Sequence, residues 1–171
     1  MKLSNAEKLA VLVTASCRSD LMNYFIDVKK VAMWVSHGNE WAIAWEYDWF
    51  ESEAHPKDQI VSETKNILEM FQHIHRSAPA EVTSAGLSAR DIVFEGFDGN
   101  NDEHYHIAGV MVDDLGRYSD VKGARNNSHS IGTLPRYLRT LTKYAAVVDR
   151  RPDSTRYDEL SSAELKEIFS K

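Results

Sequence analysis

The chain has 171 residues, of which 43% are hydrophobic and 27% charged, and it contains a single cysteine, Cys17. This composition excludes an intrinsically disordered chain, and one cysteine excludes a small scaffold held by intrachain disulfides. The formal net charge is −6, yet the segment 117–156 holds nine Lys and Arg residues against three Asp residues, so partners of either sign can be attracted. We expect one domain, residues 1–171, in a reducing cytoplasm.

The N-terminal residues predict a helix and no membrane or secretion signal. No apolar run reaches the roughly 20 residues that a membrane-spanning helix needs. The apolar segment Leu9–Ala15 adjoins Glu7 and Lys8, whereas a signal peptide is basic at that point. Because Ser4 and Glu7 have the spacing of a capping box, we predict a helix from Ser4 to about Cys17.

Hydrophobic spacing and capping residues predict an all-α, multihelical single domain. Ser19 or Asp20 is expected to cap a second helix that Gly38 ends, since glycine commonly follows the last helical residue. The one exception that we expect is a short extended segment near Ile92–Phe97, for which no second strand is predicted as a partner.

The third predicted helix, Glu40–Phe50, is apolar nearly all round. It carries Trp41, Trp45 and Trp49 at intervals of four residues. Aromatic rings bury large areas, so this helix is either a core element of its own domain, the more common role, or a contact between subunits. We expect a homo-oligomer in which Trp41 and Trp45 are the self-association residues.

A fourth helix is the clearest in the sequence. Pro56 suits its first turn, and Pro79 is expected to close it. Residues at helical spacing form one face of this helix, and they are Ile60, Thr64, Ile67, Phe71 and Ile74. Residues 80–89 are predicted to be a connector, with Ser88 and Asp91 as turn or cap residues.

Two further helices are predicted toward the C-terminus. Thr133 is expected to cap the first, which stops before Pro152. Its predicted apolar stripe comprises Leu134, Leu138, Leu141, Ala145 and Val148. Ser161 and Glu164 form a capping box for the second. Residues 119–132 contain several Gly, Asn and Ser residues and are predicted to be an irregular loop.

The stretch Ile92–Tyr118 gathers the polar residues that best suit a site. Asp98 ends an apolar run, after which Asn101 is expected to cap a helix that ends at Gly116. We predict that a ligand or partner contacts one end of this helix, through Asp98, Asn101, Arg117 or Tyr118.

Part of this stretch resembles a metal site but fails as one. Asp98, Asn100 and Asp102 match the first three ligand positions of an EF-hand calcium loop. Glu103 stands where the loop needs a glycine, and Gly109 stands where it needs a glutamate. We therefore expect these side chains to bond the first turn of the helix, with no metal bound.

Histidine and nucleophile patterns predict no catalytic residue and no cofactor. His73 with His75, and His104 with His106, lie two residues apart on predicted helices, where side chains point in nearly opposite directions and cannot clamp one ion. The chain lacks a Gly-x-Ser-x-Gly elbow, a dinucleotide-binding motif and a phosphate-binding loop.

A basic segment near the C-terminus suggests a nucleic-acid contact. Its basic residues are interleaved with tyrosines, a combination that nucleic-acid grooves use. The candidates are Arg136, Arg139, Lys143, Arg150 and Arg151. The ordinary interpretation, which we favour, is the solvated side of an amphipathic helix.

Several motifs together resemble the YfbU family of bacterial proteins. They are Leu3–Glu7, Met70–His75, Gly96–Asn101 and the turn Gly116–Tyr118. The resemblance covers nearly the whole chain and implies a multihelical, bacterial, cytoplasmic protein of no established activity, so no catalytic residue is carried over.

Three functions follow as hypotheses. The first is a non-enzymatic binding or regulatory protein that self-associates and binds no membrane. The second is a nucleic-acid-binding or nuclease-like protein that uses the segment Arg136–Arg156. The third, an enzyme, requires a deep polar pocket around Asp98, Asn101, His104 and Arg117.

Overall fold

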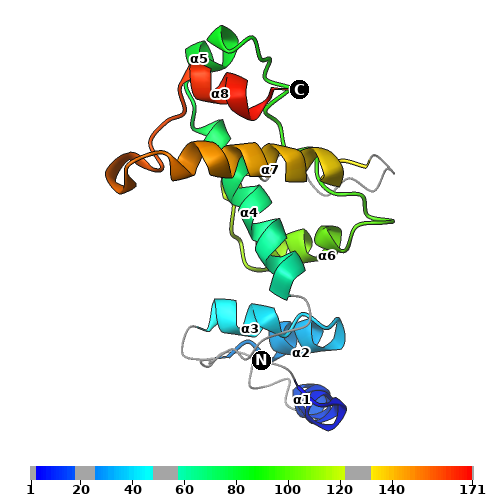
Figure 1. Cartoon of the computed structure of the whole chain (residues 1–171). Coiled ribbons are helices and arrows are strands. Elements are labelled where there is room, and N and C mark those ends of the chain that lie inside the picture. The colour runs from blue at the N-terminus through cyan, green and yellow to red at the C-terminus, as the bar shows by residue number, and fades with distance from the viewer. Residues whose placement is uncertain (1–2, 18–25, 48–57, 122–131, 171) are drawn as a thin grey trace. The chain divides into compact units, whose positions relative to one another are not determined.

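The computed structural model describes residues 3–17, 26–47, 58–121 and 132–170. Over these ranges the chain consists of α-helices, short 3-10 and π turns and irregular segments, with no β-strand, and the predicted all-α class is confirmed (Figure 1). The chain divides into two compact units, Met1–Gln59 and Ile60–Lys171. That these units act as a single domain stays a prediction.

The first unit contains α1 (Asn5–Cys17), α2 (Val28–Ser36) and α3 (Trp41–Glu46), and α1 packs on α2. The capping box predicted at the start of α1 is confirmed. The Ser4 N–H and hydroxyl donate to the Glu7 carboxylate at 2.8 and 2.7 Å, and the Glu7 N–H donates to the Ser4 hydroxyl at 3.3 Å. These bonds close within one turn and need no partner from elsewhere in the chain.

Both other helices of the first unit are shorter than predicted. Ser19 and Asp20 lie outside the described residues, and Asp27 is the N-cap of α2, where its carboxylate accepts from the Lys30 N–H at 3.0 Å. α3 ends at Glu46 because Tyr47 is extended, with φ −117° and ψ 92°. The Tyr47 hydroxyl accepts from the Asp27 N–H at 2.8 Å. The predicted helix beyond residue 47 lies outside the described residues.

The second unit contains nearly all of α4 (Asp58–His75), α5 (Pro79–Ser84), α6 (Glu103–Gly109), α7 (Leu134–Asp149) and α8 (Ser162–Ile168). A π-helical turn, Val110–Asp114, continues α6, and 3-10 turns occupy Ser119–Val121 and Asp153–Thr155. α7 crosses α4, and α8 packs against both α5 and α7 (Figure 1).

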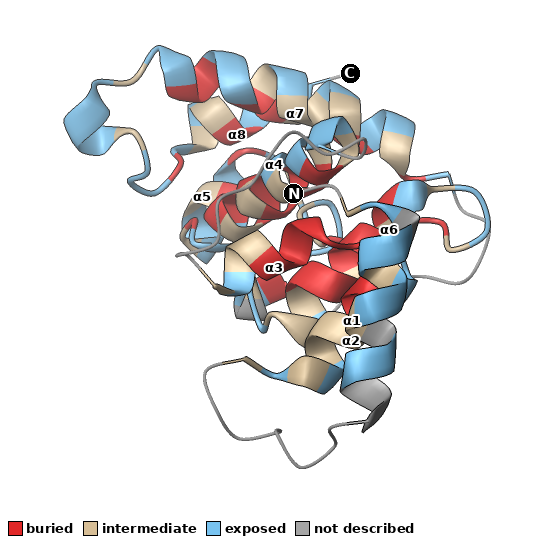
Figure 2. Cartoon of the chain, turned by 90° about the horizontal axis from the view of Figure 1, so that it is seen from below, coloured by how far each residue is buried: buried red, intermediate tan, exposed pale blue. Residues whose placement is uncertain are grey.

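The buried face of α4 is the one predicted. Thr64, Ile67 and Ile74 are fully buried, and Phe71 is nearly so (buried residues are red in Figure 2). Phe71 packs edge-on against Tyr137 of α7, with ring centroids 5.0 Å apart. This contact joins the two long helices that position the candidate site.

The predicted connector 80–89 is wrong for its first half, because α5 occupies Pro79–Ser84. α4 already ends at His75, and Pro79 instead begins α5, since a proline in the first helical turn removes no hydrogen bond of the helix. The predicted turn after α5 is present. The hydroxyl and N–H of Ser88 donate to the Asp91 carboxylate at 2.6 and 2.7 Å.

α7 buries a different face from the one predicted. Its buried residues are Tyr137, Tyr144, Val147 and Val148. Of the predicted stripe only Val148 is among them, while the three leucines are half-buried and Ala145 is exposed. Tyrosine rings are favoured in a core where their hydroxyl groups find partners. In this unit the hydroxyl groups of Tyr137 and Tyr144 both have such partners.

The segment Ile92–Phe97 is irregular and does not form the extended strand that was considered. The Glu95 N–H donates to the Tyr137 hydroxyl at 2.8 Å. The Gly96 carbonyl accepts from the hydroxyls of Tyr137, at 3.2 Å, and Thr133, at 2.8 Å. These bonds satisfy part of a backbone that pairs with no strand among the described residues. They also explain why Thr133, at the N-cap position of α7, makes no capping bond.

The entry to α6 differs from the prediction, whereas its exit agrees. Asp102, and not Asn101, is the N-cap, and it makes no side-chain capping bond. Gly116, with φ +64°, follows the π-helical turn as the predicted end of the helix. The capping box predicted for α8 is confirmed, because the Ser161 hydroxyl donates to the Glu164 carboxylate at 2.7 Å and its N–H does so at 2.9 Å.

Candidate binding site

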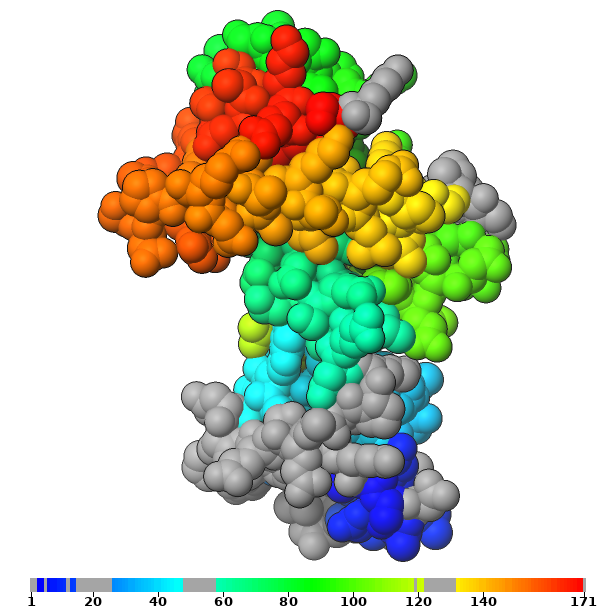
Figure 3. Space-filling view, viewed as in Figure 1, coloured from blue at the N-terminus to red at the C-terminus, as the bar shows by residue number. Residues whose placement is uncertain are grey.

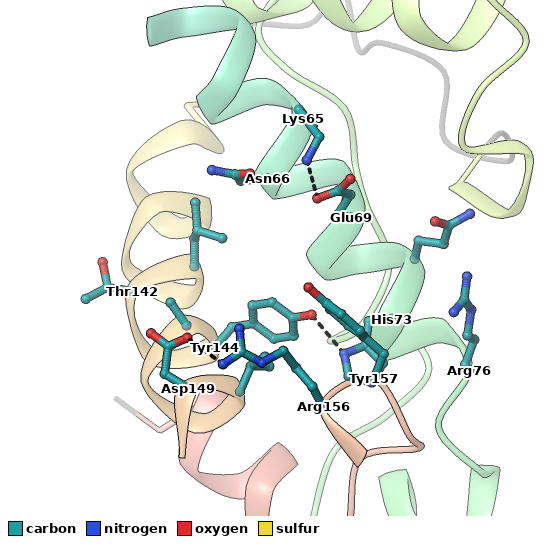
Figure 4. Close-up of a pocket in the computed structure, with 14 residues that line it drawn as sticks. Lys65, Asn66, Glu69, His73, Arg76, Thr142, Tyr144, Asp149, Arg156 and Tyr157 are labelled. Carbon is teal, nitrogen blue, oxygen red and sulfur yellow. Dashed lines mark hydrogen bonds and ion pairs between the residues drawn. The ribbon is translucent and has the colours of Figure 1, made fainter. Parts of the chain in front are cut away.

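A cavity of about 660 Å³ opens between α4, α7 and the turn that follows α7 (Figure 4). α4 contributes Lys65, Asn66, Glu69, Gln72, His73 and Arg76. α7 contributes Leu141, Thr142, Tyr144, Ala145, Val148 and Asp149, and the turn contributes Arg156 and Tyr157. In the space-filling view, α7 and this turn project beyond α4 (Figure 3). The volume suits a small organic molecule, for which sites of roughly 300–1,000 Å³ are usual.

Helical spacing gives the two walls opposite characters. Lys65, Glu69 and His73 follow one another on α4 at intervals of four residues, as Leu141 and Ala145 do on α7. Residues four apart share a helix face. α4 therefore presents a polar strip to the cavity, and α7 presents a mainly apolar one.

A histidine–tyrosine pair joins the two walls. The Tyr144 hydroxyl lies 2.8 Å from His73 Nδ1, and His73 Nε2 lies 2.8 Å from the Asp158 carbonyl oxygen. A carbonyl only accepts, so Nε2 carries the proton, and Nδ1 of the neutral ring accepts from Tyr144. Both ring nitrogens are thus used within the protein.

Burial keeps both members of this pair uncharged at neutral pH. Desolvation lowers the pKa of His73, and the positive charges of Arg151 and Arg76 lower it further. Desolvation likewise raises the pKa of Tyr144 to about 12. The pair therefore acts as a neutral hydrogen-bonded link between α4, α7 and the following turn.

The charged groups of the cavity are not equally satisfied. Lys65 and Glu69 form an ion pair of 2.8 Å. Arg156 lies 3.9 Å from the Asp149 carboxylate and 3.5 Å from that of Asp153, both longer than the roughly 2.7–2.9 Å of a strong arginine–carboxylate bond. Its Nε is buried and has no hydrogen-bond acceptor among the described residues.

Arg151 fixes the turn that completes the cavity. Its guanidinium donates to the Glu164 carboxylate at 2.7 and 2.6 Å, and to the carbonyls of Asp158 and Glu159 at 2.7 and 3.1 Å. The bond to Arg151 is the main cause that lowers the pKa of Glu164 to about 2. Because the Asp158 carbonyl also accepts from His73, two side chains hold the backbone next to Tyr157.

The residues predicted at the ends of α6 lie away from this cavity. The Asp98 carboxylate accepts from the side chain of Asn101 at 2.7 Å and from the Asn100 N–H at 2.9 Å, and these bonds lower its pKa. Tyr118 is half-buried with φ +57°, and burial raises its pKa to about 12. Arg117 is exposed at the exit of the helix. That these residues at the ends of α6 contact a ligand or partner stays a prediction.

The residues named for the polar pocket of the enzyme hypothesis have partners within the chain, and a pocket around them stays a prediction. Asp98 and Asn101 bond to each other, whereas His104 Nε2 lies 3.1 Å from the Glu63 carboxylate of α4. His73 and His104 therefore have separate partners. Among the described residues, no group of three or more His, Cys, Asp or Glu could hold a metal ion.

Four of the five residues predicted to contact nucleic acid already bond to the chain itself. Arg136 pairs with Glu95, Arg150 with Glu167 and Arg151 with Glu164, and Lys143 donates to the Ser170 hydroxyl. Arg139 is exposed on α7. These contacts engage much of the charge that a nucleic-acid groove would use, and nucleic-acid binding stays a prediction.

The two tryptophans predicted for self-association differ in exposure. Trp41 is only 3% exposed, and its indole N–H donates to the Asn39 side chain at 3.3 Å. Trp45 is half-buried and packs edge-on against Trp41, with ring centroids 5.3 Å apart. Trp45 is thus the member of the pair that a second chain can reach.

Reasoning from the sequence missed the cavity itself. It assigned Leu141 and Ala145 to a core stripe, and it gave His73 no role beyond a rejected metal pair. The available signal was the small Ala145 within a stripe of larger residues, because a small side chain leaves room between two crossing helices.

Comparison with protein-family models matches residues 22–171 to the YfbU domain. The matched range includes every residue that lines the cavity. No curated protein and no solved structure matches the chain significantly. No helix among the described residues is both long enough and apolar enough to cross a membrane.

Proposed function

This chain belongs to the YfbU family, and we propose that it is a bacterial cytoplasmic binding protein that holds a small molecule in the cavity between α4 and α7. The observation that carries the proposal is a cavity of about 660 Å³ with one apolar wall and one polar wall. Sites of this size and mixed lining are typical of small-molecule ligands.

The hydrogen bonds around the cavity favour binding over catalysis. His73 uses both ring nitrogens within the protein, so its ring has no lone pair left to take a proton from a ligand. The Thr142 hydroxyl donates to the Leu138 carbonyl at 2.9 Å, so its proton is already engaged within α7 and not with a base that would activate it as a nucleophile. A pocket whose histidine and threonine are both engaged within the protein is suited to holding a molecule unchanged.

Filling the cavity should abolish binding. Ala145 is exposed and lines the cavity, so the indole of Ala145→Trp would occupy the space of a ligand. We expect the neutral fluorescent probe N-phenyl-1-naphthylamine to bind the wild-type chain saturably and to bind Ala145→Trp at least about tenfold more weakly. The measurement is a fluorescence titration.

Ala146→Trp is the matched control. Ala146 is the next residue of α7 and is exposed, but it does not line the cavity. Its substitution should leave the probe affinity unchanged. Equal probe affinity in wild-type, Ala145→Trp and Ala146→Trp chains would contradict the proposed site.

We also propose that the chain forms a homo-oligomer through the first unit. Support comes from Trp45, which is half-buried, and from Leu9, which is 61% exposed on α1, since exposed large apolar side chains favour association. Sedimentation equilibrium should give a mass above that of one chain, and Trp45→Ser should shift it toward the monomer. A strictly monomeric wild-type chain at high concentration would refute self-association.

A further inference from the structure

We infer that the ligand of the α4–α7 cavity is an aromatic anion, with Arg156 neutralising its charge and Tyr157 and Tyr144 contacting its ring. This inference rests on the proposed function, because it specifies the ligand of that same cavity. Three features of the lining carry it: an incompletely satisfied arginine, an exposed aromatic ring next to a hydrogen-bonded stretch of backbone, and one more basic than acidic residue.

Arg156 is the group best placed to receive an anion. Its two carboxylate neighbours are long contacts, at 3.9 Å to Asp149 and 3.5 Å to Asp153, and both carboxylates are highly exposed, at 73% and 97%. Exposed ion pairs of this kind are weak. A ligand carboxylate or sulfonate can therefore compete with them, because a planar guanidinium binds such groups through two parallel hydrogen bonds.

The Nε of Arg156, which has no acceptor among the described residues, is separate evidence that this side chain can bind an anion. This nitrogen is buried and lacks an acceptor among the described residues. A buried N–H without an acceptor is rare in folded proteins and destabilising. An anion that meets the edge of the guanidinium, reached by a small rotation of the side chain, would provide the acceptor.

Tyr157 offers an aromatic surface at the opening of the cavity. Its side chain is 66% exposed, and among the described residues of the second unit it is the only large hydrophobic side chain with high exposure. The ring lies across the space between α4 and α7 in Figure 4, with its centroid 6.0 Å from that of His73. An exposed ring of this kind is suited to packing against a second ring.

The backbone next to this ring is held in place before any ligand arrives. The backbone carbonyl of the next residue, Asp158, accepts from His73 Nε2 at 2.8 Å and from Arg151 at 2.7 Å. Because His73 and Arg151 hold this backbone, it loses little freedom when a ligand binds, which favours affinity. Tyr144 and the apolar residues Leu141 and Ala145 form part of the cavity wall that α7 contributes.

The charge of the lining favours an anion over a cation. The cavity is lined by three basic residues, Lys65, Arg76 and Arg156, against two acidic residues, Glu69 and Asp149. Lys65 and Glu69 neutralise each other at 2.8 Å. The other lining residues then carry a net charge of +1, from Arg76 and Arg156 against Asp149. Asp153 lies outside the lining, 3.5 Å from Arg156, but its carboxylate is 97% exposed, so it neutralises Arg156 weakly and an anion can compete with it.

Two probes that share a ring system and differ by one sulfonate group test this inference. 8-Anilinonaphthalene-1-sulfonate carries a sulfonate on the ring system of the neutral N-phenyl-1-naphthylamine. We expect the anionic probe to bind the wild-type chain more tightly than the neutral probe. We expect Arg156→Gln to weaken the anionic probe about tenfold and to leave the neutral probe unchanged.

Control variants separate a lost charge from a lost fold. Arg150→Gln removes an exposed arginine that does not line the cavity, and it should bind both probes as the wild type does. Tyr157→Ser should weaken both probes, because it removes the ring and not the charge. Near-UV circular dichroism and a cooperative urea transition show that each variant is folded, and Arg156→Lys, which keeps the charge, should retain part of the preference for the anionic probe.

The outcomes distinguish this inference from the proposed function. If both probes bind with equal affinity, or if Arg156→Gln leaves the affinity of the anionic probe unchanged, the aromatic-anion inference is wrong while the binding site stands. If neither probe binds the wild-type chain at the cavity, as judged by Ala145→Trp, the proposed function fails as well.

Discussion

Replacing Arg151 by methionine should lower the free energy of unfolding at pH 7 by about 3 kcal/mol. Arg151 and Glu164 form a largely buried ion pair, with side chains 13% and 24% exposed. Without the guanidinium, the Glu164 carboxylate and the carbonyl of Glu159 lose a charged donor, and unpaired groups with little exposure are strongly destabilising. Urea denaturation followed by circular dichroism measures the difference.

The acid dependence of stability gives a second test of this pair. Arg151 holds the pKa of Glu164 in the folded chain at about 2, against 4.5 without its surroundings. The folded pKa is the lower one, so this stabilisation is fully present above pH 4.5 and is lost as the pH falls toward 2. Arg151→Met should flatten the fall in stability over that range.

Arg150→Met is the control for Arg151→Met. Arg150 and Glu167 form an ion pair whose side chains are 61% and 49% exposed, and exposed pairs contribute about 0–1 kcal/mol. The neighbouring substitution should therefore change the free energy of unfolding only slightly. Equal losses in the two variants would mean that burial does not decide the strength of these pairs.

Replacing Tyr137 by phenylalanine should cost about 2 kcal/mol of stability, although it removes a single oxygen atom. The Tyr137 side chain is fully buried, and its hydroxyl accepts from the Glu95 N–H and donates to the Gly96 carbonyl. The Gly96 carbonyl keeps its bond from Thr133, so the Glu95 N–H is the group left without a partner. Differential scanning calorimetry gives the loss, and hydrogen exchange at the Glu95 amide gives its location.

Tyr157→Phe is the matched control for Tyr137→Phe, because it removes the same atom from a ring that is 66% exposed. Its stability should be that of the wild type. If Tyr137→Phe also unfolds at the wild-type temperature with unchanged exchange at Glu95, then α7 does not satisfy the backbone of this segment.

Features that close within one helical turn were predictable from the sequence. The capping boxes of Ser4 with Glu7 and of Ser161 with Glu164 form as expected, because each is a contact between residues three positions apart. The exit at Gly116 likewise depends on the backbone freedom of one residue. The same reasoning did not predict that Asp27 is the N-cap of α2, because several residues in this part of the chain can serve as a cap.

The candidate site was not predictable, because its contacts join distant parts of the chain. His73 bonds to Tyr144 and Asp158, which are 71 and 85 positions away. Hydrophobic spacing ranks leucine above tyrosine as a core residue, and it placed Leu141, and not Tyr144, in the predicted apolar stripe. A tyrosine becomes a core residue only when a partner for its hydroxyl lies nearby, and the crossing of α4 and α7 supplies that partner.

Local patterns along the chain were sufficient to predict the all-α class, the buried face of α4, the two capping boxes and the family to which the chain belongs. The buried face of α7, the partners of the Ile92–Phe97 backbone and the place of the cavity follow from the packing of distant elements. The physical reason is the separation along the chain of the residues that each feature depends on. Caps and helix faces depend on residues within four positions, whereas burial and cavities depend on which elements meet across the chain.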